Sequence, residues 1–300
     1  MVPNRHDLQD PWKVSLHGGH SSEFCDHARS PLRDILEAAV ARGYHVFGVT
    51  EHAPRVEPRF LYPEEITLGW DVAKLRRDFE AYARLLAVLA REFTERLVVL
   101  RGFEAEVIPA DGYVDLMLGL RKRLGFEYIV GSVHWLDDEI FDYGKDAYYR
   151  VVARYGGLEP FAVRYYEVLA EMVCNLKPEV VGHLDIVRKH ADPPDAVETA
   201  AVRLAAEKAL EAIRAHGCIV DVNSAGLRKG LASPYPAPWL VRRAAAMGIP
   251  FCFGDDSHRA ADVGVGISEA REYLLQNGVT SITTLTRESG EIARKVVPLW

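Results

Sequence analysis

Short apolar runs alternate with longer amphipathic segments along most of the chain, and this alternation predicts the elements of the fold. Runs rich in Val, Ile and Phe are typical of buried strands, and apolar residues at every third or fourth position are typical of helices with one buried face. The predicted strands are 13–20, 45–52, 96–104, 128–134, 179–185, 218–225 and 249–258. The predicted helices are 31–42, 71–96, 113–124, 160–176, 197–215, 238–247 and 268–275.

About seven strand–helix units follow one another, which favours an α/β barrel with a parallel sheet over an open doubly wound sheet. Ser30 as a cap and Pro31 at the next position predict the start of the first helix. No linker separates two halves, so we expect residues 1–300 to form a single domain. The first strand is not followed by a GxGxxG motif or a P-loop, which disfavours a nucleotide-binding fold.

The composition narrows the classes of partner. The chain has 300 residues, of which 49% are hydrophobic and 26% charged, so it can bury a large core. Its formal net charge is −7 and it has no long run of Lys and Arg, so we expect no nucleic acid partner. A small phosphorylated metabolite remains compatible, because local arginines bind phosphate within acidic proteins.

The sequence also predicts a compartment. No stretch approaches the roughly 20 apolar residues of a membrane span. The four cysteines are scattered without a CxxC pair, and the first residues, MVPNRHDLQDPWK, lack the apolar core of a signal peptide. We therefore expect a cytoplasmic protein with free thiols and no membrane partner, and the oligomeric state stays open.

Histidines and carboxylates gather where the predicted strands end, and in α/β barrels these ends surround one mouth. In chain order the ends carry His17 and His20, Glu51 and His52, Glu104 and Glu106, His134, His183 and Asp185, and Asp256 and His258, with His27 in the first loop. One such histidine alone is more often a hydrogen-bonded structural residue than a ligand. Seven of the chain's 11 histidines in matching positions instead indicate a metal cluster, because cations would offset the cost of burying so many polar groups.

The residue types restrict the metals. Imidazole and carboxylate ligands without thiolate suit Zn, Mn or Fe, whereas Mg prefers an all-oxygen site. The candidates exceed the three or four protein ligands of one catalytic zinc, so we expect two or three divalent metals. A carboxylate such as Glu104 would bridge two of them.

The motifs match a known family. The segments HGGHSSEFCDHA, VTEHAP, GFEAE, GSVHW, VGHLD and GDDSH resemble the PHP family, named for polymerase and histidinol phosphatase. VTEHAPRVEPRFLYPEE and NSAGLRK resemble its histidinol-phosphate phosphatase branch in particular. The resemblance extends from about residue 14 to about residue 264, and it implies a distorted (β/α)₇ barrel with a trinuclear metal site.

The resemblance also implies which residues hold each metal. His17, His20 and Asp256 would hold the first metal, and Glu104 would bridge it to a second held by His134 and His183. The third metal would be held by His27, His52 and His258. Glu51, Glu106, Asp185 and Asp255 would orient ligand imidazoles or contact the substrate.

One departure from the family concerns the first motif. The family has H-x-H, whereas this chain has His17-Gly18-Gly19-His20, so alignment on His20 places Gly18 at the first ligand position. Glycines tolerate the conformations of a β-bulge, and a bulge would return His17 to the metal. The alternative is a metal that lacks one protein ligand.

The resemblance implies hydrolysis of L-histidinol phosphate to L-histidinol and phosphate. Arg188 and Arg228 would bind the phosphate, with Lys229 and Arg55 as weaker candidates, and Glu51, Glu106 and Glu23 would meet the amino and imidazole groups. Asp256 is the first candidate for the protonating acid and His258 the second.

Other readings of the same residues remain open. An amidohydrolase is also a metal barrel, although Glu104 stands where such enzymes use a modified lysine. A PHP phosphodiesterase acting on another small phosphoester and a non-catalytic metal- or phosphometabolite-binding protein are further alternatives. Cys25, inside the ligand loop, is interpreted as a packed thiol, because no free histidine is left to activate it as a nucleophile.

Overall fold

Seven parallel strands form the centre of the molecule in the computed structural model, which describes residues 10–288 and 290–300. In sheet order they are β1 (Val14–Ser15), β2 (Val46–His52), β3 (Val98–Ala105), β4 (Tyr128–Gly131), β7 (Val180–Val181), β8 (Ile219–Asn223) and β9 (Phe251–Gly254). The backbone N–H of Leu16 donates to the carbonyl of Phe253, which joins the segment after β1 to β9 and nearly closes the sheet into a barrel. The predicted α/β barrel is therefore confirmed.

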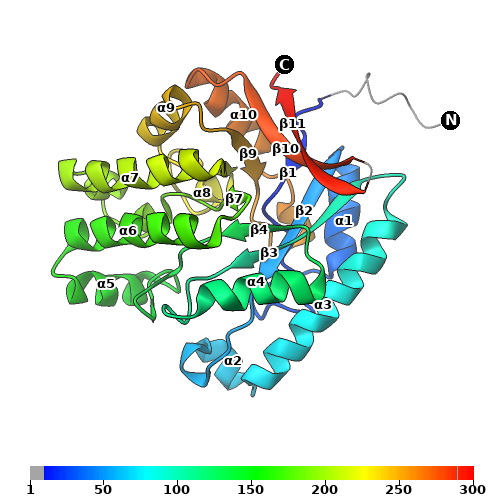
Figure 1. Ribbon diagram of the computed structural model, residues 1–300, viewed down its shortest axis with the longest axis horizontal. Coiled ribbons are helices and arrows are strands. Elements are labelled where there is room, and N and C mark those ends of the chain that lie inside the picture. The colour runs from blue at the N-terminus through cyan, green and yellow to red at the C-terminus, as the bar shows by residue number, and fades with distance from the viewer. Residues whose placement is uncertain (1–9, 289) are drawn as a thin grey trace.

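Helices connect successive strands and cover the outside of the sheet (Figure 1). They are α1 (Leu32–Ala41), α2 (Pro63–Thr67), α3 (Val72–Glu92), α4 (Tyr113–Leu124), α5 (Lys145–Arg154), α6 (Leu158–Leu176), α7 (Ala200–His216), α8 (Ala225–Arg228), α9 (Pro238–Ala246) and α10 (Ile267–Gln276). The helices are amphipathic, and each long one buries its apolar stripe against the sheet. The parallel order needs such crossovers, and they bring all strand ends to one mouth.

Four features differ from the predicted elements. The irregular segment before residue 160 contains α5, and the chain ends in an antiparallel hairpin of β10 (Ser281–Glu288) and β11 (Glu291–Pro298). A second, short hairpin, β5 (Trp135–Leu136) with β6 (Glu139–Ile140), follows β4. Helix α1 begins without a Ser30 cap, because the Glu23 carboxylate accepts the Leu32 N–H instead. Glu23 was expected to meet the substrate. In the structure its carboxylate caps helix α1 instead.

The C-terminal hairpin lies against the barrel near β1 (Figure 1). Arg287 on β10 donates to both carboxylate oxygens of Glu127, at 2.6 and 2.7 Å, and to the Val99 carbonyl. A two-pronged contact of this kind fixes orientation as well as distance. The hairpin is therefore attached at the amino-terminal side of β3 and β4, away from the mouth.

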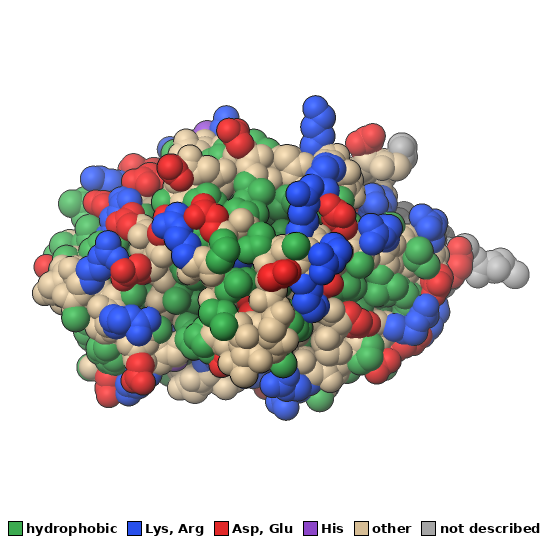
Figure 2. All heavy atoms as spheres, turned by 90° about the horizontal axis from the view of Figure 1, so that it is seen from below, with side chains coloured by type: hydrophobic (Ala, Val, Ile, Leu, Met, Phe, Trp, Pro, Cys, Tyr) green, Lys and Arg blue, Asp and Glu red, His purple; other side chains and the backbone are tan. Residues whose placement is uncertain are grey.

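The outer surface shows no single dominant charge on the face seen in Figure 2. Figure 2 shows Lys and Arg side chains intermixed with Asp and Glu on the face seen from below, so this face carries mixed charge. Among the helices of the described residues, none has both the length and the apolar character needed to cross a membrane.

Tyr128 on β4 fills the barrel interior. Its ring is fully buried, and its hydroxyl donates to the Leu16 carbonyl at 2.8 Å. A Cβ at Gly102 would lie 2.5 Å from the Tyr128 ring, and one at Gly48 would collide with the Tyr128 hydroxyl. Glycines on β2 and β3 therefore make the room that the ring occupies, and the floor of the barrel is packed.

We expect Gly102→Ala to lower the free energy of unfolding by about 1–3 kcal/mol, because the added methyl overpacks a core that cannot yield. Gly119→Ala is the matched control, since Gly119 is an exposed position of α4 with open space around it. The control should raise stability by about 1 kcal/mol through helix propensity. Urea unfolding measures both, and equal stability of the two variants would contradict the packing of Tyr128.

Candidate metal centre

Glu104, at the end of β3, lies at the centre of the predicted cluster. Its carboxylate is 1% exposed and is surrounded by imidazoles from the other strand ends. Oε1 lies 3.2 Å from His17 Nε2, 3.1 Å from His183 Nε2 and 3.8 Å from His134 Nε2, while Oε2 lies 2.8 Å from His52 Nδ1 and 3.9 Å from His20 Nε2. One carboxylate therefore faces five histidines, three through one oxygen and two through the other.

Carboxylates orient three of these imidazoles. His17 Nδ1 lies 2.8 Å from Asp221, His20 Nδ1 lies 3.3 Å from Glu51, and His134 Nδ1 is hydrogen-bonded to Glu106. In each case Nε2 is the nitrogen that faces the shared centre. A carboxylate behind a histidine fixes its tautomer and ring direction, as it does for metal-bound histidines.

His17 reaches the cluster through a slot lined by glycines. A Cβ at Gly254 would lie 2.8 Å from the His17 Cβ, and one at Gly182 would lie 3.0 Å from its Cε1. The His17 carbonyl accepts both the Asp255 and Asp256 N–H groups, which is the two-against-one pairing of a β-bulge. The doubled pairing therefore lies at Asp255 and Asp256, after β9, and a bulge at Gly18 and Gly19 themselves stays a prediction.

Gly18 has no room for a side chain. A Cβ there would collide with the Asp255 carboxylate. Gly19 has a φ of +81°, a conformation that glycine adopts at little cost. Gly18, which alignment places at the first ligand position, therefore carries no side chain there. His17, the residue before it, points into the cluster instead.

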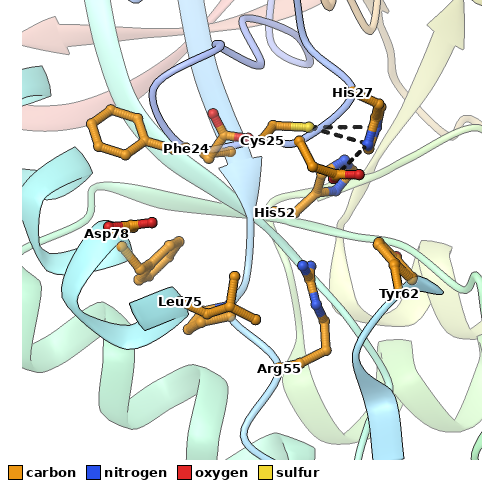
Figure 3. Close-up of a pocket in the computed structure, with 12 residues that line it drawn as sticks. Phe24, Cys25, His27, His52, Arg55, Tyr62, Leu75 and Asp78 are labelled. Carbon is orange, nitrogen blue, oxygen red and sulfur yellow. Dashed lines mark hydrogen bonds and ion pairs between the residues drawn. The ribbon is translucent and has the colours of Figure 1, made fainter. Parts of the chain in front are cut away.

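Glu104 forms one group with His17 and His20 and a second with His134 and His183. A third group of side chains lies beside them. Ligand atoms of His27, His52, His258 and Cys25 lie within 4.8 Å of one another. The buried Cys25 sulfur points to the His27 ring, 3.4 Å from Nδ1, with His52 close by (Figure 3). Burial raises the pKa of the Cys25 thiol well above its usual value, so the thiol is protonated at neutral pH, in agreement with a packed thiol.

Asp256 and His258 come from the loop after β9. Asp256 Oδ1 lies 3.3 Å from His20 Nε2 and 3.7 Å from His258 Nδ1. Asp256 has a φ of +45°, and His183 has one of +21°. Such backbone is costly for residues with a Cβ and is found mostly where side chains must be aimed at a site.

The charges of the cluster depend on one another. Burial lowers the pKa of His134, but Glu106 and Glu104 outweigh it and raise that pKa to about 10. Burial together with the neighbouring His20 lowers the pKa of His52 to about 4. Burial raises the pKa of Glu104, yet His17 and His134 hold it well below its usual value. Protons on some imidazoles thus balance the buried carboxylate, and a bound cation would replace them.

Several buried atoms in the cluster fit metal ligation. Nε2 of His17, His20 and His258, together with Glu104 Oε2, are buried and make no hydrogen bond within the described residues. Buried polar atoms normally have partners, and a group of ligand-type atoms that share one space is explained by a cation. The donor set, mostly imidazole with carboxylate, fits Zn, Mn or Fe.

A cavity of about 760 Å³ opens over the cluster. Glu104, His134, His183, Asp256 and His258 lie at its base. Its walls include the predicted substrate-binding residues Arg228 and Lys229. The Arg228 guanidinium also donates to the Asp255 and Asp256 carbonyls, so it holds the loop that carries Asp256.

Other predicted substrate contacts lie elsewhere. Arg188 is buried and does not line the cavity, because its Nε lies 2.9 Å from Asp185 and its Nη2 donates to the Ser233 hydroxyl and the Pro234 carbonyl. Arg55 forms a buried ion pair with Glu65. Both guanidiniums thus have partners within the protein, and their phosphate-binding roles stay predictions.

Two acids predicted to meet the substrate have partners among the histidines. Glu51 is 2% exposed and contacts His20 and the Ser21 N–H, and Glu106 is 3% exposed and contacts His134. Of the two roles left open for Glu51 and Glu106, orienting an imidazole is therefore the one that the geometry favours.

Asp221 was missed by the sequence analysis. It lies inside β8, and its Oδ2 accepts hydrogen bonds from His17 and from the Asn223 amide, each at 2.8 Å. An acid within an otherwise apolar strand was the available signal, since a buried carboxylate requires a partner.

The chain matches known proteins in sequence and in fold. The PHP domain model matches residues 17–225. The chain belongs to the PHP family. The match includes six of the seven clustered histidines, and His258 lies beyond it. That a single PHP-type phosphatase domain spans residues 1–300 stays a prediction.

Curated relatives of the chain carry one activity in their names. The histidinol-phosphatase of Bacillus subtilis is 29% identical over 258 residues, which cover 82% of this chain and 94% of the relative. The histidinol-phosphatase of Saccharomyces cerevisiae is 26% identical over 292 residues, covering 86% of this chain and 87% of the relative. A "probable histidinol-phosphatase" of Deinococcus radiodurans is 32% identical over 268 residues, covering 87% and 92%.

Solved structures share the fold. The hisK protein of Listeria monocytogenes has a TM-score of 0.75 at 23% identity, covering 86% of this chain and 99% of that chain. The histidinol phosphate phosphatase of Lactococcus lactis, complexed with zinc, L-histidinol and phosphate, has a TM-score of 0.68 at 17% identity, covering 94% and 99%. Both likenesses support the (β/α)₇ barrel.

We expect Asp221→Asn to weaken metal binding by about 10–100-fold, because an amide holds the His17 ring less firmly than a carboxylate does. Competition with a chromogenic chelator measures the affinity, and circular dichroism verifies the fold. Asp115→Asn, on the exposed side of α4, is the control. Unchanged affinity in the Asp221 variant would show that His17 needs no carboxylate behind it, or that it binds no metal.

Proposed function

We propose that this protein is a metal-dependent histidinol-phosphate phosphatase, which hydrolyses L-histidinol phosphate to L-histidinol and phosphate. The observation that carries the proposal is the carboxylate of Glu104, buried among five imidazoles beneath a cavity with basic side chains. The names of the curated relatives supply the substrate.

Three neighbouring groups of side chains would hold two or three divalent metals. The first is His17, His20 and Glu104 with Asp256, and the second is Glu104, His134 and His183. The third is His27, His52 and His258. Glu104 belongs to the first two and would bridge them. When bound, Zn, Mn or Fe would lower the pKa of a water molecule and offset the charge of phosphate oxygens.

The chain's own residues hold the phosphate ester over the cluster. Arg228, in the cavity wall, offers the planar guanidinium that suits phosphate, and Lys229 adds a point charge at the exposed rim. Asp221, Glu51 and Glu106 keep three imidazoles directed at the centre. The substrate would thus meet a preorganised set of charges.

Hydrolysis breaks the bond between phosphorus and the ester oxygen, and the leaving alkoxide needs a proton. Asp256 and His258 are the proposed catalytic residues, because both line the cavity beside the cluster. Contacts with His20 and His258 outweigh the effect of burial and hold the pKa of Asp256 well below its usual value. Asp256 is therefore ionised at neutral pH, and this is the form that can take a proton from the attacking water and then give it to the leaving alkoxide.

The test of the substrate is phosphate release by the metal-loaded protein. L-histidinol phosphate, nucleoside monophosphates and a cyclic amide are offered in parallel with Zn or Mn. We expect phosphate release from L-histidinol phosphate with a kcat/KM at least about 100-fold above that for the nucleotides. Only this substrate carries the histidinol group that the cavity is proposed to accept. Activity confined to another ester would overturn the substrate, and inactivity with every metal would favour a binding protein.

We expect Glu104→Gln to lose both metal and turnover, because the amide cannot serve two metals with two anionic oxygens. Elemental analysis of the purified variant should find at least one equivalent fewer bound metal, and phosphate release should fall by 100-fold or more on the scale of about 3 kcal/mol. Glu95→Gln, at an exposed position before β3, is the matched control. Full metal content in the Glu104 variant would remove it as the bridge.

A further inference from the structure

Most basic side chains in the cavity wall come from three neighbouring loops, whose own acids, Asp26, Asp256 and Asp262, lie near His27, His20 and Arg259. Because the strands lie in the order β8, β9, β1 across the closure, the loops after these three strands are neighbours. They contribute the basic side chains of Arg228, Lys229, Arg259 and Arg29 to the cavity. The loops after β2 and β4, on the other side, contribute Tyr62, Glu64, Asp142 and Tyr143.

On the basic side, three charges have no carboxylate partner among the described residues. Arg29 donates to the Asp26 and Ala28 carbonyls, Arg228 to the Asp255 and Asp256 carbonyls, and Lys229 forms no ion pair. Arg259 alone is paired, with Asp262 at 2.8 Å. This side of the cavity therefore attracts anions.

On the opposite side, Glu64 forms no ion pair with a Lys or Arg among the described residues. Its carboxylate accepts the Tyr143 hydroxyl and meets no Lys or Arg, whereas the nearby Asp142 is paired with Lys189 at 2.9 Å. The rings of Tyr62 and Tyr143 lie 5.8 Å apart at 26° and are both in the wall. An anion beside two aromatic rings is suited to a cationic or ring-bearing group.

The segment that carries this wall is held rigidly. Arg55 and Glu65 form a buried ion pair, the Arg55 guanidinium lies 4.5 Å from the Tyr62 ring, and Glu65 accepts the Tyr62 N–H at 2.9 Å. Arg55 and Tyr62 lie together beneath the cluster in Figure 3. The wall is thus formed before a ligand arrives, which reduces the entropy lost on binding.

We propose that Glu64, Tyr62 and Tyr143 form the subsite that selects the organic part of the substrate, opposite the basic side that takes the phosphate. The inference rests on the proposed function and adds its specificity. The ring of the substrate packs against the two tyrosines, and its positive charge lies near the Glu64 carboxylate. Phosphate and cation then occupy opposite sides of one cavity, so the charges of the wall set the orientation of the substrate.

The experiment separates the two halves of the ligand. L-histidinol and inorganic phosphate are used as separate inhibitors of the metal-loaded full chain, with L-histidinol phosphate as substrate. Glu64→Gln should weaken inhibition by L-histidinol about tenfold and raise KM similarly, with a smaller effect on kcat, because one charged contact is lost. The inhibition constant of phosphate for this variant should stay within about twofold of its value for the unaltered protein.

Two further variants and a control complete the test. Tyr143→Leu and Tyr62→Leu should also weaken inhibition by L-histidinol more than inhibition by phosphate. The Tyr143 variant remains informative if the Tyr62 variant fails to fold. Glu159→Gln, exposed in the first turn of α6, controls for the loss of a surface charge. Turnover of L-histidinol phosphate with equal inhibition in all variants would overturn the subsite alone. Absence of that turnover in the unaltered protein would overturn the proposed function.

Discussion

Burial of the Glu104 carboxylate among imidazoles is the constraint on which the rest of the site depends. An anion that is 1% exposed is stable only beside positive charge, whether protons on histidines or metal cations. Each histidine that meets this charge needs a fixed direction, so further carboxylates stand behind His17, His20 and His134. The mouth of the barrel is therefore a network in which each buried acid is stabilised by a neighbouring imidazole, and each of these imidazoles is oriented by an acid.

Much of this arrangement was predictable from the sequence, because strand ends of an α/β barrel converge on one mouth. The seven clustered histidines and Glu104 were found in that way, and the apolar runs located each strand of the barrel. The strands of the barrel lie in the order of the predicted βα units, because a parallel sheet with short connections leaves few other topologies.

The rest depends on directions that sequence does not encode locally. Arg188 follows a strand end, yet a short turn, Ile186–Arg188, directs it to Asp185 and away from the cavity. Asp221 seemed to be an ordinary strand residue, because its partner His17 lies more than two hundred positions earlier. The slot for the His17 ring exists through Gly182 and Gly254, and small residues on distant strands reveal a space only after the strands are placed.

The packed interior around Tyr128 has a consequence for the traffic of small molecules. This ring and its neighbours fill the floor, so the described residues leave no passage through the centre of the barrel. Whatever reaches the cluster must enter and depart by the same opening. A phosphate product would therefore leave past the same basic side of the wall that its successor meets on entry.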